Sequence, residues 1–98
     1  MEDIIALGDK INLVGFKIFS GSEMIIIRKM IGNYVRKFME KDKDFTMLTL
    51  HVKTIHEIED NKRFEMKAAY EGTQTMHVDG SEKNVFVCLD NLLKKLDR

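Results

Sequence analysis

Basic residues gather in two segments that also carry the periodicity of helices, and these residues are the best candidates for chemistry. Residues 20–41 hold five basic and two acidic residues: Arg28, Lys29, Arg36, Lys37 and Lys41 against Glu23 and Glu40. Residues 81–98 hold four basic and three acidic residues: Lys83, Lys94, Lys95 and Arg98 against Glu82, Asp90 and Asp97. Cations on a helix side can bind phosphates and release counterions, which makes binding salt-dependent. Without further information, the same pattern is more typical of a solvated helix face.

Other residue types with possible chemistry are sparse. His51, His56 and His77 lack a second cysteine or a close carboxylate partner of the kind that a zinc site needs, so we expect no metal. His51 and His77 are predicted to share one sheet face, where either side chain could bond or stack with RNA. The only cysteine, Cys88, lies on an apolar helix stripe and is predicted to be buried.

Enzyme signatures are also missing from the pattern. Glu57 and Glu59 fall in or beside a predicted turn, not in a concave pocket that could shift their pKa values. No Gly-rich phosphate loop and no Ser/His/Asp set stands out. We therefore expect a protein that is not an enzyme, with no catalytic residue, cofactor or small-molecule substrate. Phe16 and Phe45, near strand ends, could stack on bases or pack in a core.

The composition sets the scale of the molecule. A chain of 98 residues is expected to form one domain, residues 1–98, with one hydrophobic core. Sixteen basic and sixteen acidic residues cancel, so only an uneven distribution of charge could favour nucleic acid. No apolar run approaches the ~20 residues of a membrane span, and the acidic start is unlike a signal peptide. We expect a cytoplasmic protein without a membrane partner.

Two helices frame the predicted fold. The first should begin after Ser20, because Ser20 and Glu23 have the spacing of a capping box, and run to about Glu40. The second carries an apolar stripe between residues 84 and 98, with Ser81 as its expected N-cap. Before the first helix, residues 11–18 are strand-like. Residues 4–7 could pair with them across Gly8-Asp9, or form a short helix.

Three strands should lie between the helices. From Phe45 onward, apolar residues alternate with polar ones, and turns are predicted at Glu59–Lys62 and Glu71–Gly72. The predicted fold class is α+β, in the order β-α-β-β-β-α, with a four-stranded mixed sheet. Since only one sheet face is apolar, both helices should pack on that face. The first helix should join two parallel strands by a right-handed crossover.

The end of the chain resembles a known family. Residues 85–90 read Val-Phe-Val-Cys-Leu-Asp and are followed by Leu92 and by Lys95-Leu96-Asp97-Arg98. This order is similar to the last helix of the ribosome hibernation-promoting factors, or ribosome-associated inhibitors. Ile11-Asn12-Leu13-Val14-Gly15 looks like their first strand, and Ile27-Arg28, Met30-Ile31 and Lys37 are similar to their first helix. The resemblance spans residues 11–98 and leaves residues 1–10 as an N-terminal extension of open structure.

The resemblance implies a function. These factors occupy the messenger and transfer RNA channel of the small ribosomal subunit and so repress translation in idle, stressed cells. The resemblance also implies RNA contacts at the residues that match those of the factors by position: Arg28, Lys37, Lys95 and Arg98. Their basic neighbours are inferred from charge alone: Lys29, Arg36, Lys83 and Lys94.

Two other functions stay open. The chain could be an interaction module that forms a homodimer through the open sheet face, with Met47, Ile55 and Thr75. It could also bind double-stranded RNA, because double-stranded-RNA-binding domains have a related α-β-β-β-α order.

Overall fold

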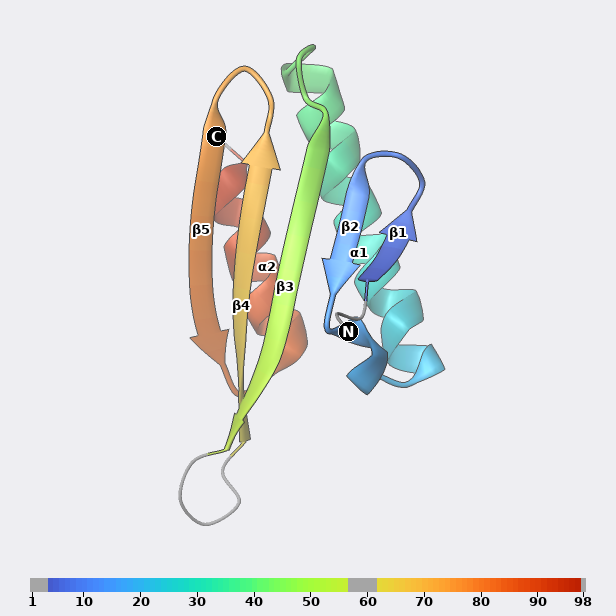
Figure 1. Cartoon of the computed structure of the whole chain (residues 1–98), viewed down its shortest axis with the longest axis vertical. Coiled ribbons are helices and arrows are strands. Elements are labelled where there is room, and N and C mark those ends of the chain that lie inside the picture. The colour runs from blue at the N-terminus through green and yellow to red at the C-terminus, as the bar shows by residue number, and fades with distance from the viewer. Residues whose placement is uncertain (1–3, 57–61, 98) are drawn as a thin grey trace.

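A computed structural model describes residues 4–56 and 62–97 as a five-stranded mixed sheet with two helices behind it (Figure 1). The elements are β1 (Ile4–Leu7), β2 (Ile11–Val14), a 3-10 turn η1 (Phe16–Ile18), α1 (Gly21–Lys41), β3 (Met47–His56), β4 (Lys62–Glu71), β5 (Thr75–Glu82) and α2 (Val85–Leu96). The strands lie in the order β1-β2-β3-β4-β5. The α+β class is confirmed, and the order β-α-β-β-β-α is followed from β2 onward.

The N-terminal hairpin supplies the strand that the sequence prediction did not count. β1 pairs antiparallel with β2, with Leu7 opposite Ile11, across a turn in which Gly8 has a φ of 69°. The hairpin is therefore the correct one of the two alternatives for residues 4–7. The prediction of four strands is wrong, because it assigned no structure to residues 1–10.

The second strand is shorter than predicted. It ends at Val14, not at Ile18, because Gly15 takes a left-handed conformation, with a φ of 84°, and turns the chain into η1. This turn places Phe16 in the core, where its side chain is fully buried. Phe45 is also buried, so packing explains both of these aromatic residues.

Helix α1 starts where the sequence predicts. The Ser20 side chain accepts from the Glu23 amide, and the Glu23 carboxylate accepts from the Ser20 amide, which completes the capping box. The helix ends at Lys41 and leads into β3, which pairs parallel with β2. A helix that connects two parallel neighbours has to cross over one sheet face, and this fixes α1 there.

The long strands alternate as predicted. In β3 to β5, register pairs such as Leu50 with Ala68, and Ala68 with Val78, place the apolar rows on the helix side. The predicted turn at Glu59–Lys62 lies outside the described residues except for Lys62, which begins β4. One prediction is wrong: Ser81 lies within β5, paired with Glu65, because the ladder continues to Glu82.

Asn84 caps α2 in place of Ser81. Its side-chain oxygen accepts from the amides of Phe86 and Val87. The apolar stripe of α2 is buried, and Cys88 lies in it as expected, with 2% of its surface exposed.

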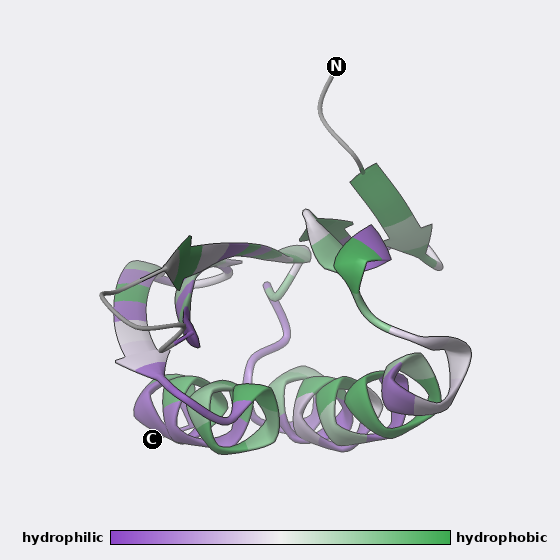
Figure 2. Cartoon of the chain, turned by 90° about the horizontal axis from the view of Figure 1, so that it is seen from below, coloured by the Kyte–Doolittle hydropathy of each residue, from purple (hydrophilic) through white to green (hydrophobic). Residues whose placement is uncertain are grey.

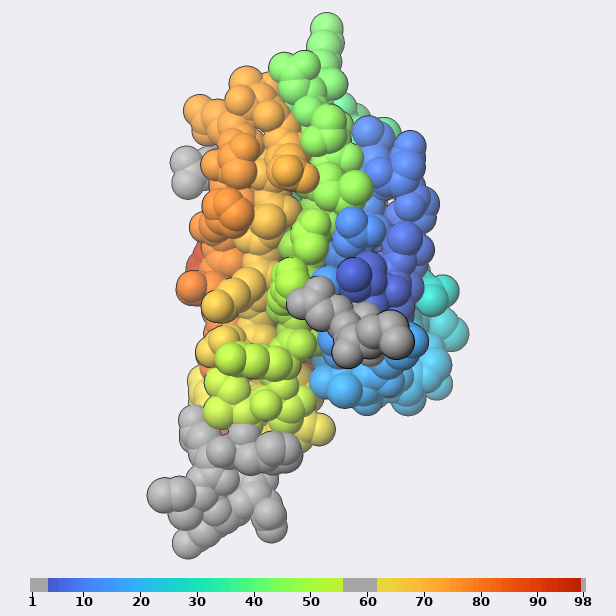
Figure 3. All heavy atoms as spheres, viewed as in Figure 1, coloured from blue at the N-terminus to red at the C-terminus, as the bar shows by residue number. Residues whose placement is uncertain are grey.

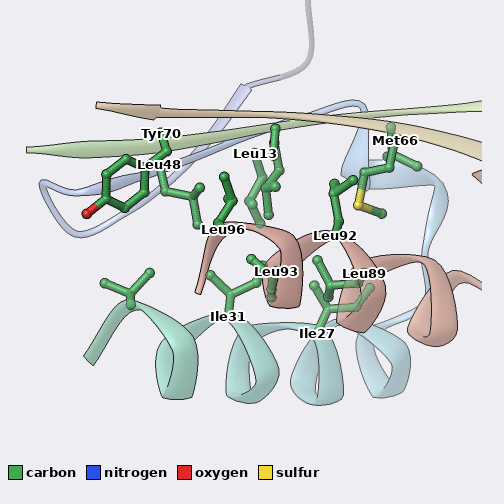
Figure 4. Packing of buried hydrophobic residues seen from close by; sticks show 14 of the residues in the cluster. Leu13, Ile27, Ile31, Leu48, Met66, Tyr70, Leu89, Leu92, Leu93 and Leu96 are labelled. Carbon is green, nitrogen blue, oxygen red and sulfur yellow. The ribbon is translucent and has the colours of Figure 1, made fainter. Parts of the chain in front are cut away.

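Both helices cover the same face of the sheet, as predicted (Figure 2). Figure 4 shows the shared core, in which side chains from the sheet, from α1 and from α2 converge; the labelled residues are Leu13, Leu48, Met66, Tyr70, Ile27, Ile31, Leu89, Leu92, Leu93 and Leu96. The other sheet face carries no helix (Figure 2). Within the described part of the chain, neither helix is long and apolar enough to cross a membrane.

Two glycines provide a matched test of this fold. Both have a positive φ, but a Cβ at Gly8 would meet no atom within 4 Å, whereas a Cβ at Gly15 would collide with the backbone carbonyl of Val52. Gly8→Ala should therefore cost only the left-handed strain, about 1–2 kcal/mol of unfolding free energy. Gly15→Ala should cost about 3 kcal/mol or more, since β3 must also move. Urea unfolding of both variants measures the difference, and equal costs would contradict the close approach of η1 to β3.

Candidate nucleic-acid interface

The outer side of α1 carries the most exposed cations. Ile27, Ile31 and Val35 face the core, so the opposite side of the helix faces solvent. Lys29 and Arg36 are exposed there, seven residues and about 10 Å of helix apart. Neither side chain has a hydrogen bond or ion pair with another residue in the described ranges. Lys29 and Arg36 are therefore both available to contact phosphates of a nucleic-acid backbone.

Arg28 and Lys37 border this outer side. Arg28 is exposed and, among the residues that the structure describes, has no polar partner. Lys37 is also exposed, and its ammonium lies 5.0 Å from the ring centre of Tyr34, a cation–π distance. With Lys29 and Arg36, these residues define the α1 basic surface: Arg28, Lys29, Arg36 and Lys37.

The cations of α2 are arranged differently. The Lys94 ammonium lies 2.9 Å from Asp90, and this ion pair lowers the pKa of the Asp90 carboxyl, chiefly through the hydrogen bond that Lys94 donates. The Lys95 ammonium donates to the backbone carbonyl of Asp79 in β5, at 2.9 Å. Lys83 is exposed between β5 and α2, and Arg98 lies outside the described residues. Lys94 and Lys95 therefore already have protein partners, and Lys83 lies in the connection between β5 and α2.

An acidic seam separates the two helices. The Tyr34 hydroxyl in α1 donates to Asp90 in α2 at 3.1 Å, and burial is the main cause that raises the pKa of this phenol. Further along, the Lys41 ammonium lies 2.8 Å from Asp97. The two carboxylates face α1 and neutralise the cations beside them. Among residues 4–56 and 62–97, the predicted site residues are therefore not brought together in one band, and four of them form the α1 basic surface.

The open sheet face, which faces the viewer in Figure 3, carries residues of both charges. His51 lies opposite Lys67, and Lys67 lies opposite Asp79, while Lys53 and Glu65 approach to 3.4 Å. His51 and His77 share this face, as predicted, and line a shallow hollow with Lys67. Across residues 4–56 and 62–97, no group of three or more His, Cys, Asp or Glu side chains could hold a metal ion.

The strongly perturbed carboxylate of Asp42 belongs to a structural clasp. Its oxygens accept from the hydroxyls of Tyr70 and Thr73, both at 2.6 Å, and from the amides of Thr73 and Asp44. The hydrogen bonds from Thr73 and then from Tyr70 lower the pKa of Asp42 to about 2. Because these bonds tie the end of α1 to the β4–β5 turn, the shift has a structural cause and indicates no catalytic role.

Sequence reasoning missed the contacts between the helices. The spacing of Asp90 and Lys94, four residues apart on a helix, could have indicated their ion pair. No local signal pointed to the bonds of Tyr34 and Lys41 with α2, because those depend on how the two helices are rotated in the fold. Comparison with known proteins adds no assignment: no protein-family model matches the chain, and no curated protein matches it.

Acid should weaken the clasp. Since the folded pKa of Asp42 lies near 2, below its usual value of 3.8, ionised Asp42 stabilises the fold above about pH 4. That contribution is lost as the pH falls from about 4 through 2. We expect the melting temperature of the wild type to fall more steeply over this interval than that of Asp42→Asn. Asp79→Asn, which changes an exposed carboxylate on the open face, is the control and should retain the wild-type slope. Identical slopes in all three proteins would contradict the clasp.

Proposed function

We propose that this protein binds structured RNA in the small ribosomal subunit through the α1 basic surface and so lowers translation. The observation that carries the proposal is that Arg28, Lys29 and Arg36 are exposed and have no polar partner among the described residues. A cation without an internal partner can bind a phosphate without first breaking a protein contact. Asn33 lies exposed between Lys29 and Arg36 and adds a side-chain donor and acceptor.

The charge distribution supports a local contact over long-range attraction. The whole chain has a formal net charge of zero, so it should not be drawn strongly to nucleic acid from a distance. On α1, however, each phosphate contact would release counterions from the RNA. Binding should then be specific to one side of the protein and sensitive to salt.

Helix α2 should contribute less to RNA binding. An exposed ion pair four residues apart on a helix is worth only about 0.3–0.5 kcal/mol, so a phosphate could compete with Asp90 for Lys94. Asp90 would then lie beside that phosphate and repel it. Lys95 would also have to leave the carbonyl of Asp79.

The choice of the ribosome as the partner rests on the resemblance of residues 11–98 to the hibernation factors. The architecture is compatible with it, because β2, α1, β3, β4, β5 and α2 follow the expected order. Binding to plain duplex RNA is the competing form of the same proposal. Association through the open sheet face stays a prediction, since Met47, Ile55 and Thr75 lie there among charges of both signs.

Removing two cations of the α1 basic surface should weaken binding to small ribosomal subunits. Each phosphate contact changes the slope of log affinity against log salt by about 0.7–0.9. The double variant Lys29→Gln/Arg36→Gln should therefore lower affinity about 10–100-fold near 100 mM salt and reduce the slope by about 1.4–1.8. Cosedimentation with subunits across a salt series measures both quantities.

The matched control is Lys53→Gln/Lys67→Gln, which removes the same charge from the open sheet face. It should bind like the wild type. No binding of the wild type at low salt, or equal losses in the two double variants, would refute the proposal. Equal wild-type affinity for a plain RNA duplex and for subunits would replace the ribosome with duplex RNA as the ligand.

A further inference from the structure

An exposed apolar stripe on α1 takes no part in the core and runs between Arg28 and Arg36 of the α1 basic surface. Ile25, Gly32 and Met39 are spaced by seven residues, about two helical turns, so they lie along one side of the helix. Ile25 is 69% exposed and Met39 is 49% exposed. The two large side chains stand at equal distances on either side of Gly32.

This stripe faces away from α2. Nine residues, or about two and a half turns, separate Gly32 from Lys41, so the two residues point to opposite sides of α1. Lys41 points to α2, where it meets Asp97. The stripe therefore lies on the β1 side of the molecule, because α2 packs on β4 and β5 at the far end of the sheet. Figure 3 shows atoms of the first half of α1 beyond the outer edge of β1.

Packing within the chain does not explain Gly32. A Cβ at this position would meet no atom within 4 Å. Glycine is among the least favourable residues inside a helix, and alanine would fit here without any contact. A glycine between two exposed apolar residues does allow another helix to approach the backbone closely. The position thus points to an intermolecular neighbour.

We propose that a second copy of the chain packs its α1 antiparallel against this α1, with the two helices crossing at Gly32. The symmetry of the stripe about Gly32 favours this occupant. In an antiparallel pair, Ile25 meets Met39 of the second copy, and Met39 meets its Ile25, so one twofold axis satisfies both ends. The bulky residues then flank a close crossing at the two glycines.

The sheet edges support a closed dimer on this side. The edge strand β1 is Ile-Ile-Ala-Leu, with no charged residue to deter pairing, and Ile4 is 56% exposed. At the opposite edge, Lys95 donates to the carbonyl of Asp79, and Arg63 donates to the carbonyl of Ser81. Long basic side chains therefore occupy acceptors of β5. Association is directed to one flank, which yields a dimer and not a filament.

Salt separates this dimer from RNA binding. Arg28 and Arg36 border the stripe on its two sides, four residues from Gly32 in each direction. An antiparallel pair brings these like charges toward those of the second copy, so screening by salt should strengthen the dimer. RNA binding through the same helix should weaken with salt.

Sedimentation equilibrium of the full chain, from about 10 µM to about 1 mM, tests the proposal, since a small interface should associate weakly. The wild type should show a monomer–dimer equilibrium that shifts toward dimer between low and high salt. Ile25→Glu or Met39→Lys alone should raise the dissociation constant at least about tenfold. The double variant Ile25→Glu/Met39→Lys should regain most of the affinity, because the new charges face each other with opposite sign. Gly32→Ala should weaken the dimer while it raises the melting temperature of the monomer.

Ile26→Glu is the matched control, because Ile26 is 48% exposed on the same helix but lies about 100° around from Ile25. It should dimerise like the wild type. A wild type that stays monomeric at about 1 mM overturns the proposal. So does an effect of Ile26→Glu equal to that of Ile25→Glu, or dissociation caused by Thr49→Arg on the open sheet face. A wild type that dimerises as described but does not bind RNA would overturn only the proposed function.

Discussion

The structure depends on the burial of a single apolar sheet face by two helices. Leu48 and Leu50 of β3, and Met66 and Ala68 of β4, all point to that face, and each is at most 3% exposed. Water must be excluded from this surface, and the two helices are the only described elements that cover it. Their apolar stripes are consequently fixed toward the sheet, and everything polar on them must lie at the seam or outside.

This constraint decides where charge can act. Once Leu92 and Leu93 of α2 are buried, Asp90 and Asp97 turn toward α1 and meet Tyr34 and Lys41. Carboxylates at the seam compensate the cations near them. On the outer side of α1, Glu40 is the only acidic residue, so that side retains an excess of positive charge. The distribution of charge over a chain of zero net charge therefore follows from how the helices are rotated by the core.

Local patterns predicted much of this arrangement. The alternation in β3 to β5 was sufficient to predict which side of each strand is buried, because shifting the strand pairing by one residue would expose the whole apolar row. The Ser20 and Glu23 pair was sufficient for the start of α1 because both halves of a capping box are local. Ser81 and Asn84 are both good caps, and only the pairing of β5 with β4 decides between them. Likewise, residues 11–18 have a strand-like pattern, but β2 ends at Val14 because Gly15 takes a left-handed conformation.

For the candidate site, the sequence singled out cations on both helices but could not separate partnered from unpartnered ones. Lys95 matches the resembling motif, yet in the fold it binds a carbonyl of a strand sixteen residues away in sequence. Lys29, inferred from charge alone, proves to be among the most available. Such differences arise between elements, so no window of sequence contains them.

The most direct test of the α1 basic surface is lysine footprinting of the intact chain, free and bound to small ribosomal subunits. Acylation rates read by mass spectrometry report each ammonium separately within one sample. The proposed RNA contact predicts strong protection of Lys29 and Lys37 on binding, with Lys53 and Lys67 unchanged on the open sheet face. Protection of Lys53 and Lys67, with Lys29 and Lys37 still reactive, would contradict the account.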